Sequence, residues 1–186
     1  MLFRSPGRDP WRKGLPTLLA ALAALRSRPW HLLVAGLRSP SAWMRRAGLP
    51  ASAATFRAHV DPVALASASD LCLLPTWRDP CGLVVLEALA CGTPAITTAA
   101  AGAAEALGDA ECGTVLPEPG RSDLLQAAIA GWLERLAEKP PDRMRVRAAV
   151  ADRGLCAWLG AMEAALLELA APEAQDRTAV PEGGRP

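Results

Sequence analysis

The sequence has 186 residues, of which 51% are apolar, so it is long enough for one globular domain with a substantial core. No stretch approaches the ~20 consecutive apolar residues that a membrane helix needs. The N-terminal residues also lack the apolar centre of a signal peptide. We therefore expect a cytoplasmic protein.

The formal net charge of +1 indicates no nucleic acid or other polyanion as a partner. The charge is unevenly spread, because the first 50 residues hold nine Lys or Arg and a single acid, Asp9. Such a bias fits a small anionic ligand near the N-terminal region, but it equally fits an ordinary solvated basic face. Lys13 is one of only two lysines in the chain. As a compact point charge it is suited to a phosphate.

The five cysteines are odd in number and never spaced as C-x-x-C. This pattern is evidence against both a disulfide framework and a zinc site. We expect the cysteines to be small apolar fillers of the core.

Short apolar runs alternate with helical patterns along the chain, which predicts an α/β fold. We expect one Rossmann-like, doubly wound parallel sheet with C-terminal helices. The predicted strands are 1–5, 31–35, 54–57, 70–74, 94–98 and 113–116, and the predicted helices are 15–26, 41–47, 62–68, 82–91, 101–107, 122–138, 142–151 and 155–171.

The predicted domain covers residues 1–171, and residues 172–186 are too polar and too rich in Pro and Gly to fold, so a disordered tail is expected. The first strand begins at the first residue of the sequence. A domain taken from a longer chain would look like this.

The densest chemical signal is segment 79–94, DPCGLVVLEALACGTP. A predicted buried strand ends before it, a loop carries Asp79, and a helix starts near Gly82. Helix N-termini at the carboxyl edge of a sheet bind phosphate, since their free N–H groups and the helix dipole favour an anion.

Glu87 is the only charged residue of a predicted helix that is apolar on every face, so that helix should be buried. A buried carboxylate needs hydrogen-bond donors, which a sugar diol supplies. Glu87 could instead pair with an Arg or cap a loop. Asp79 could be an ordinary helix N-cap, because Asp before Pro is common there.

Segment 79–94 resembles the glycosyltransferase group 1 proteins, also called family 4, which include lipopolysaccharide core glucosyltransferases. Their donor domains carry two acids separated by seven residues, followed by an Ala-Leu-Ala-x-Gly-x-Pro stretch. The resemblance implies that Glu87 holds the ribose hydroxyls and that Asp79, where most relatives have Glu, faces the donor sugar. It also implies that the amides of Gly82, Leu83 and Val84 meet the diphosphate.

The resemblance extends to the basic pair Arg8-x4-Lys13, whose charges would neutralise the leaving diphosphate. The Arg of that pair could be Arg8 or Arg12, and a Lys before Gly could also be a solvated loop. Gly36 matches a glycine near the nucleotide, and His59 and Val60 match a segment beside the base. His59 alone would more often be a structural histidine.

The family resemblance implies half of a two-domain GT-B enzyme that transfers a sugar with retained configuration from a nucleotide sugar. The acceptor domain would be missing, or encoded separately, so the chain alone should be inactive. Any membrane association would be peripheral, through that missing half. The sequence has no Asp-x-Asp motif, so no metal or other cofactor is expected.

Two other interpretations are considered. The chain could be a non-catalytic nucleotide-sugar-binding module or an inactive remnant of a split gene. A nicotinamide-binding Rossmann domain is excluded, because no G-x-G-x-x-G follows the first strand.

Overall fold

The computed structural model describes residues 2–4, 9–37 and 41–170, and for Leu2–Arg4, Ser41 and Leu155 it describes the backbone only. The described chain divides into two compact units, residues 1–151 and residues from 152 onward, and each is described by itself. The expected boundary between domain and tail at residue 171 falls where the description ends, so it stays a prediction.

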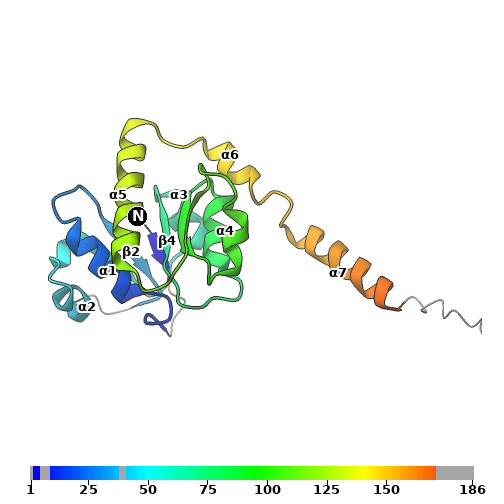
Figure 1. Cartoon of the computed structure of the whole chain (residues 1–186), viewed down its shortest axis with the longest axis horizontal. Coiled ribbons are helices and arrows are strands. Elements are labelled where there is room, and N and C mark those ends of the chain that lie inside the picture. Colours follow the sequence, from blue (N-terminus) through cyan, green and yellow to red (C-terminus); the bar gives the residue numbers. More distant parts are fainter. Residues whose placement is uncertain (1, 5–8, 38–40, 171–186) are drawn as a thin grey trace, which may run out of the picture. The chain divides into compact units, whose positions relative to one another are not determined.

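The first unit is built on a six-stranded sheet in which every neighbouring pair is parallel (Figure 1). The spatial order is β3-β2-β1-β4-β5-β6. The strands are β1 (Leu2–Arg4), β2 (Leu32–Ala35), β3 (Ala54–Arg57), β4 (Cys72–Leu74), β5 (Ala95–Thr98) and β6 (Gly113–Leu116). This order is that of a doubly wound Rossmann-like sheet, which confirms the predicted fold class. It reverses between β1 and β4, where such sheets place their ligands.

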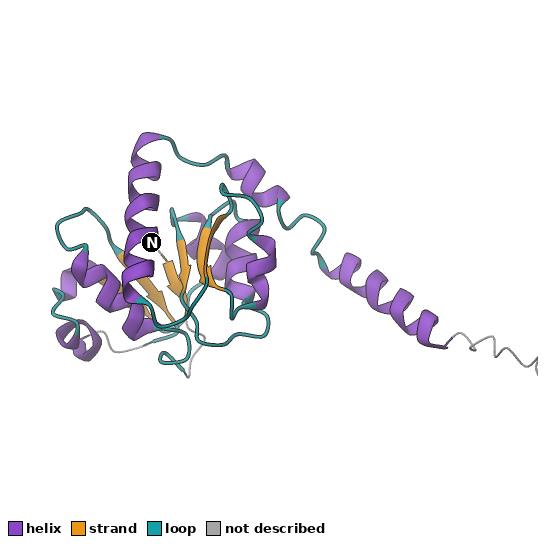
Figure 2. Ribbon diagram, in the orientation of Figure 1, coloured by secondary structure: helices purple, strands orange, loops and turns teal. Residues whose placement is uncertain are grey.

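The helices of the first unit cover both faces of the sheet (Figure 2). Core contacts put α1, α2 and α5 on one face and α3, α4 and α6 on the other. Their bounds are α1 (Leu15–Ala24), α2 (Ser41–Arg46), α3 (Pro62–Ser67), α4 (Leu83–Ala90), α5 (Ser122–Glu138) and α6 (Arg143–Ala148), with 3-10 helices η1 (Ala51–Ala53) and η2 (Gly102–Ala106).

Side-chain capping sets two of these helix starts. Asp61 accepts the N–H of Val63 at 2.9 Å, and the proline at the first position of α3 needs no donor there. Asp142 accepts the N–H of Met144 at 2.9 Å at the start of α6. Between the two layers of helices, β4 is buried along its whole length. Burial from both sides explains why this strand is a continuous apolar run without alternation.

Three sequence expectations need correction. The helix expected at 101–107 is a 3-10 helix, η2. The helix α4 is not buried all round, because Leu83 is 62% exposed and Ala90 is exposed. A helix on a sheet needs only one buried face, so an all-apolar sequence does not require burial of the other. Of the cysteines, Cys72 and Cys112 are buried fillers, whereas Cys81 and Cys156 are exposed.

The second unit contains α7 (Leu155–Ala170), whose apolar side chains are largely exposed within this unit. Its exposed residues include Trp158, Leu159, Met162, Leu166, Leu167 and Leu169. Within the described part of the chain, neither this helix nor any other is long and apolar enough to cross a membrane.

Candidate functional site

Two loops meet where the strand order reverses, one leading from β1 into α1 and one leading from β4 into α4. The backbone oxygen of Arg12 accepts hydrogen bonds from Thr76 Oγ1 at 2.9 Å and from the N–H of Trp77 at 2.8 Å. The Arg12 guanidinium donates to the carbonyl of Arg78 at 2.6 Å. Residues far apart in sequence are therefore held together at the carboxyl edge of the sheet.

Gly14 permits this close approach. It has φ +79°, and a Cβ atom there would lie 1.9 Å from the carbonyl oxygen of Pro75. Only glycine fits both the left-handed conformation and the contact. The glycine after Lys13 thus has a packing reason that the sequence alone did not reveal.

Lys13 and Asp79 form an ion pair across this junction, although they are 66 positions apart. Each residue is only 8% exposed. Lys13 Nζ donates to Asp79 Oδ2, and the other carboxylate oxygen, Oδ1, accepts the N–H of Gly82 at 3.0 Å. The structure therefore brings together the cation, the acid and the helix N-terminus that sequence analysis selected separately.

The Asp79 carboxyl stays ionised in this setting. Burial by itself would raise its pKa, but hydrogen bonds from Lys13 and from the N–H groups of Gly82 and Cys81, together with the charge of Lys13, lower the pKa below its ordinary value of 3.8. Asp79 is not the N-cap residue of α4, which is Gly82. Its bond to the Gly82 N–H still resembles capping, as the alternative interpretation anticipated.

The N-terminus of α4 faces this junction. Gly82 has φ +74°, and a Cβ there would press on Ala103 at 3.1 Å. The amide of Gly82 donates to Asp79, whereas in the described turns, loops and caps no backbone hydrogen bond is donated by the amides of Leu83 or Val84. A hollow of about 350 Å³ lies next to it, lined by Arg78, Asp79, Pro80, Ala99, Ala100, Ala101, Gly102, Ala104 and Glu105.

Glu87 lies one turn further along α4 and is half-buried. The expectation that the helix carrying Glu87 is buried on every face is therefore wrong, because α4 leaves one face open. No described contact tests the ribose-binding role, which stays a prediction.

Gly36, His59 and Val60 follow the carboxyl ends of β2 and β3, on the same sheet edge as Lys13. Gly36 has φ +92°, and its N–H donates to the carbonyl of Arg57 at 2.8 Å. His59 is exposed and Val60 is half-buried. Their role beside a nucleotide base is a prediction that their position allows.

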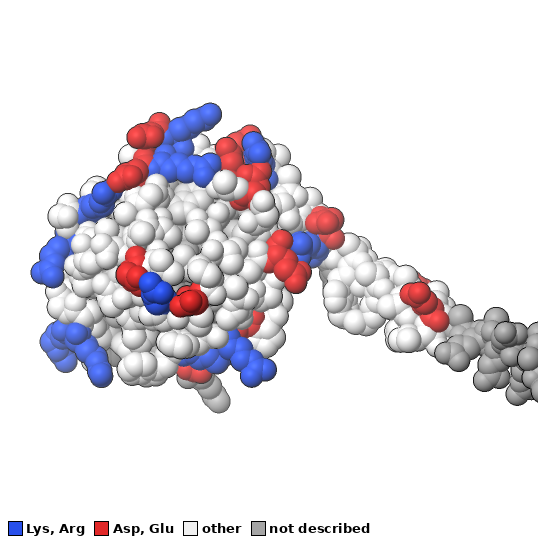
Figure 3. All heavy atoms as spheres, viewed as in Figure 1, with Lys and Arg blue, Asp and Glu red and all other residues white. Residues whose placement is uncertain are grey.

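The basic N-terminal region divides into different uses. Arg8 lies outside the described residues. Arg12 pairs with Asp9 at 3.2 Å and holds Arg78, so its guanidinium fastens the two loops. Over α2 the surface carries basic and no acidic side chains (Figure 3), and Arg45 and Arg46 there are exposed. Among the described cations of this region, Lys13 alone is buried at the junction, and the solvated face accounts for the two arginines of α2.

Sequence analysis missed a set of threonines that fasten the junction. Thr76 is fully buried, and its carbonyl accepts Thr98 Oγ1 at 2.6 Å. Thr97 Oγ1 donates to the carbonyl of Leu74 at 2.9 Å. A hydroxyl at the end of an otherwise apolar strand needs a buried partner, and that signal was present in the sequence.

Comparison with known proteins identifies the family. The family model "Glycosyl transferases group 1" matches residues 3–135. Lipopolysaccharide glucosyltransferase WaaG of Escherichia coli (strain K12) is 35% identical over 134 residues, which cover 69% of this chain and 36% of that protein.

Solved structures agree with this assignment. A crystal structure of WaaG, described as a glycosyltransferase involved in lipopolysaccharide biosynthesis, matches with a TM-score of 0.71 and 30% identity, covering 89% of this chain and 46% of its own. Anabaena HepE in complex with UDP matches with a TM-score of 0.72 and 24% identity, covering 90% and 48%, which shows a shared fold. The chain thus spans about half the length of these solved relatives, and it belongs to the glycosyl transferases group 1 family.

Proposed function

We propose that this chain is the donor-binding half of a retaining hexosyltransferase that uses a nucleotide-diphosphate sugar, in the synthesis of cell-envelope glycan or lipopolysaccharide. The observation that carries the proposal is the convergence of Lys13 and the N-terminus of α4 at the point where the strand order reverses. Two relatives support a nucleotide-sugar donor: WaaG is named a lipopolysaccharide glucosyltransferase, and HepE was solved in complex with UDP.

The chemistry of this half would be positioning and charge neutralisation. Lys13, with Arg8 or Arg12, would stabilise the negative charge that develops on the leaving diphosphate, and the amides of Leu83 and Val84 would add uncharged donors. Glu87 would accept the ribose hydroxyls, and Gly36, His59 and Val60 would border the base. This scheme requires no divalent metal or other cofactor.

Transfer would also need groups that bind the acceptor. We expect them in a second domain outside these 186 residues, in the same polypeptide or a separate one, and any peripheral membrane contact would come through it. A cytoplasmic location is part of the proposal. It is supported by five cysteines that all remain free thiols in the described residues.

A non-catalytic nucleotide-sugar-binding module remains the second candidate. The specific observation in its favour is the Asp at position 79, where the family resemblance implies a longer Glu. Supplying an acceptor domain in trans separates the two, because sugar transfer would then appear only if the donor half is competent.

Calorimetry on the isolated chain tests the donor site directly. We expect weak binding of UDP, GDP or ADP sugars, and an absence of heat with all of them would contradict the proposal. Without an acceptor domain, no sugar transfer is expected.

Two substitutions separate the assigned roles. Glu87→Gln should weaken a bare nucleoside and its diphosphate alike, by about 1–3 kcal/mol, because it removes the charge that accepts ribose O–H groups. Lys13→Ala should spare the nucleoside and weaken only phosphorylated ligands, less so as salt rises. Equal losses of thermal stability with unchanged relative affinities would instead make both residues structural.

A further inference from the structure

The carboxylate of Asp79 is bound in the way that a phosphate would be bound. One oxygen receives Lys13 Nζ, and the other receives the N–H of Gly82, the N-cap residue of α4. A cation and a helix N-terminus are the two kinds of donor that proteins aim at phosphate oxygens. We infer that Asp79 is an internal anion that competes with the diphosphate of the nucleotide for Lys13 and for the N-terminus of α4.

Hydrogen bonds on both sides hold the backbone of Asp79 in place. The N–H of Asp79 donates to the carbonyl of Ala100 at 3.0 Å, and the carbonyl of Asp79 accepts the N–H of Gly102 at 3.0 Å. Asp79 also pairs with Ala101 in an isolated parallel bridge. These bonds hold the backbone of Asp79 at the junction, and from there its carboxylate accepts the N–H of Gly82.

Lys13 is the partner that can change places. Its backbone is also anchored, since its N–H donates to the carbonyl of Asp9 at 3.2 Å and its neighbour Arg12 holds the second loop. Its side chain, however, has four methylene groups and three donors, so Nζ can turn from a fixed carboxylate to an entering phosphate. The exchange leaves Asp79 Oδ2 available to the donor sugar, the contact that the family resemblance implies for this residue.

Removing the charge of Asp79 has two opposing effects on the affinity for a diphosphate. Asn at this position keeps an oxygen for the Gly82 N–H but no longer attracts Lys13, so some ordering of Lys13 is lost. It also removes the electrostatic repulsion between the Asp79 carboxylate and a phosphate a few ångströms away. At a protein surface, this repulsion is larger than the free energy of ordering the Lys13 side chain. Asp79→Asn should therefore bind a diphosphate more tightly, by about tenfold or more.

The inference rests on the proposed donor site, so the probes are inorganic pyrophosphate, UDP and uridine, measured by calorimetry on the full chain. Asp79→Asn should bind pyrophosphate and UDP about tenfold more tightly than the unsubstituted chain, with uridine unchanged. Asp79→Ser removes the same charge and serves if Asn disturbs folding. Glu105→Gln is the matched control, since Glu105 is an exposed carboxylate on the rim of the same hollow, and it should change affinity by less than about threefold.

A chemical measurement reports on the pair without any nucleotide. The chain has two lysines, buried Lys13 and exposed Lys139, so acetylation mapped by mass spectrometry contains its own reference. Lys13 should react more slowly than Lys139 in the unsubstituted chain and should gain reactivity in Asp79→Asn. Pyrophosphate should protect Lys13 again in that variant.

The possible outcomes distinguish a failure of the competition by Asp79 from a failure of the proposed donor site. If the unsubstituted chain binds UDP but both charge-removing variants bind it equally or more weakly, Asp79 is not a competitor and the inference is overturned. If Lys13 reacts as fast as Lys139 in the unsubstituted chain, the pair itself is absent. If no variant binds any phosphorylated probe while the lysine pattern is as expected, the donor-site proposal fails, and the competition fails with it.

Discussion

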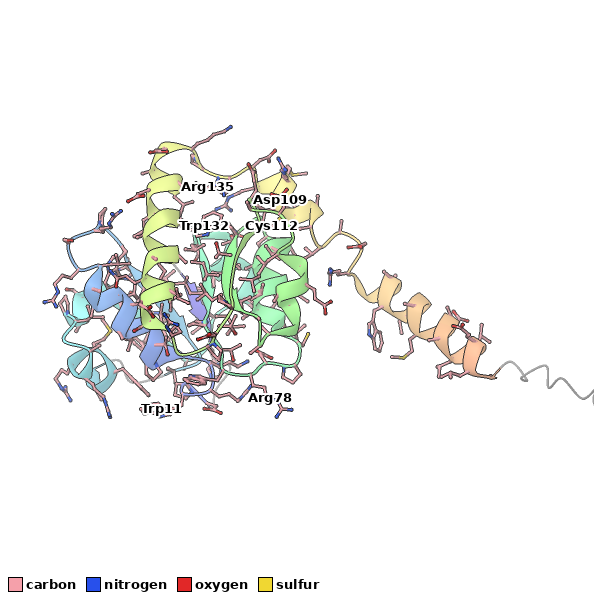
Figure 4. The ribbon with its side chains drawn as sticks, in the orientation of Figure 1. Trp11, Arg78, Asp109, Cys112, Trp132 and Arg135 are labelled. Atoms are coloured by element: carbon pink, nitrogen blue, oxygen red, sulfur yellow. The ribbon has the colours of Figure 1, made fainter. Side chains whose placement is uncertain are left out.

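The ion pairs at the two ends of the parallel strands differ in how deeply they are buried. At the carboxyl edge, Lys13 and Asp79 are each 8% exposed and hold two loops of the candidate site together. Before β6, Arg145 pairs with Asp109 at 2.6 Å with side chains 59% and 39% exposed. In Figure 4, Asp109 and Arg135 lie at the opposite end of the strands from Trp11 and Arg78.

The pKa values of Asp79 and Asp109 are both lowered, but in different surroundings. The N–H of Glu111 and then the guanidinium of Arg145 lower the pKa of Asp109, whose side chain is 39% exposed to solvent. Asp79 reaches a lowered pKa against the effect of its own burial. A charge that water could solvate is cheap to hold, whereas a buried one has to be matched by built-in donors. The carboxyl edge is therefore where substitutions should do most harm.

Gly14→Ala should have the largest effect on stability. The added Cβ would overlap the carbonyl of Pro75 and disfavour the φ of +79°, so we expect about 3 kcal/mol or more to be lost from the free energy of unfolding. Urea denaturation measures it. The matched control is Gly131→Ala in α5, where a Cβ meets nothing within 4 Å and helix propensity favours Ala by up to about 1 kcal/mol. Equal effects at the two glycines would show that the loops do not meet as described.

Lys13→Met should come next, with a loss of about 1–3 kcal/mol, because it leaves the Asp79 carboxylate buried without its cation. The figure is below that of fully enclosed pairs, since this pair lies at the edge of the sheet. Lys139→Met, at the exposed lysine, is the control and should leave the urea midpoint unchanged. A loss no larger than the control's would mean that water replaces Lys13 readily.

Acid titration of the Asp79 carboxylate should give a smaller effect on stability. Because the pKa of Asp79 in the folded chain is lowered, its contribution to stability is present above the unfolded value near 3.8 and is lost as pH falls through the folded value. Asp79→Asn should therefore flatten the fall of stability below pH 3.8. The measurement is the urea midpoint as a function of pH, and an unchanged slope in this variant would contradict the lowered pKa.

Arg145→Gln should have the smallest effect. Its partner Asp109 is half-exposed and also accepts the N–H of Glu111 at 2.8 Å, so the carboxylate keeps a donor and access to solvent after the change. We expect a thermal midpoint indistinguishable from that of the unsubstituted chain. A drop comparable to that of Lys13→Met would erase the contrast between the two edges.

The sequence by itself determined the fold class and most element positions. Alternation of short apolar runs with helical patterns is a local property, so strands such as 54–57 and 113–116 were predicted with the bounds that the structure has. The spacing of Asp79 and Glu87 was equally local and sufficed to indicate the family. Where prediction failed, at η2 and on the open face of α4, the outcome depended on what packs against the segment.

Only the tertiary structure decided which partners these residues have. Lys13 and Asp79 are 66 positions apart, and no pattern in either segment encodes their pairing. The pairing arises because β1 and β4 are neighbours in the sheet, which brings the loops at their carboxyl ends together. A contact of this kind depends on strand order, and strand order follows from how the whole chain packs its apolar surface rather than from any one segment.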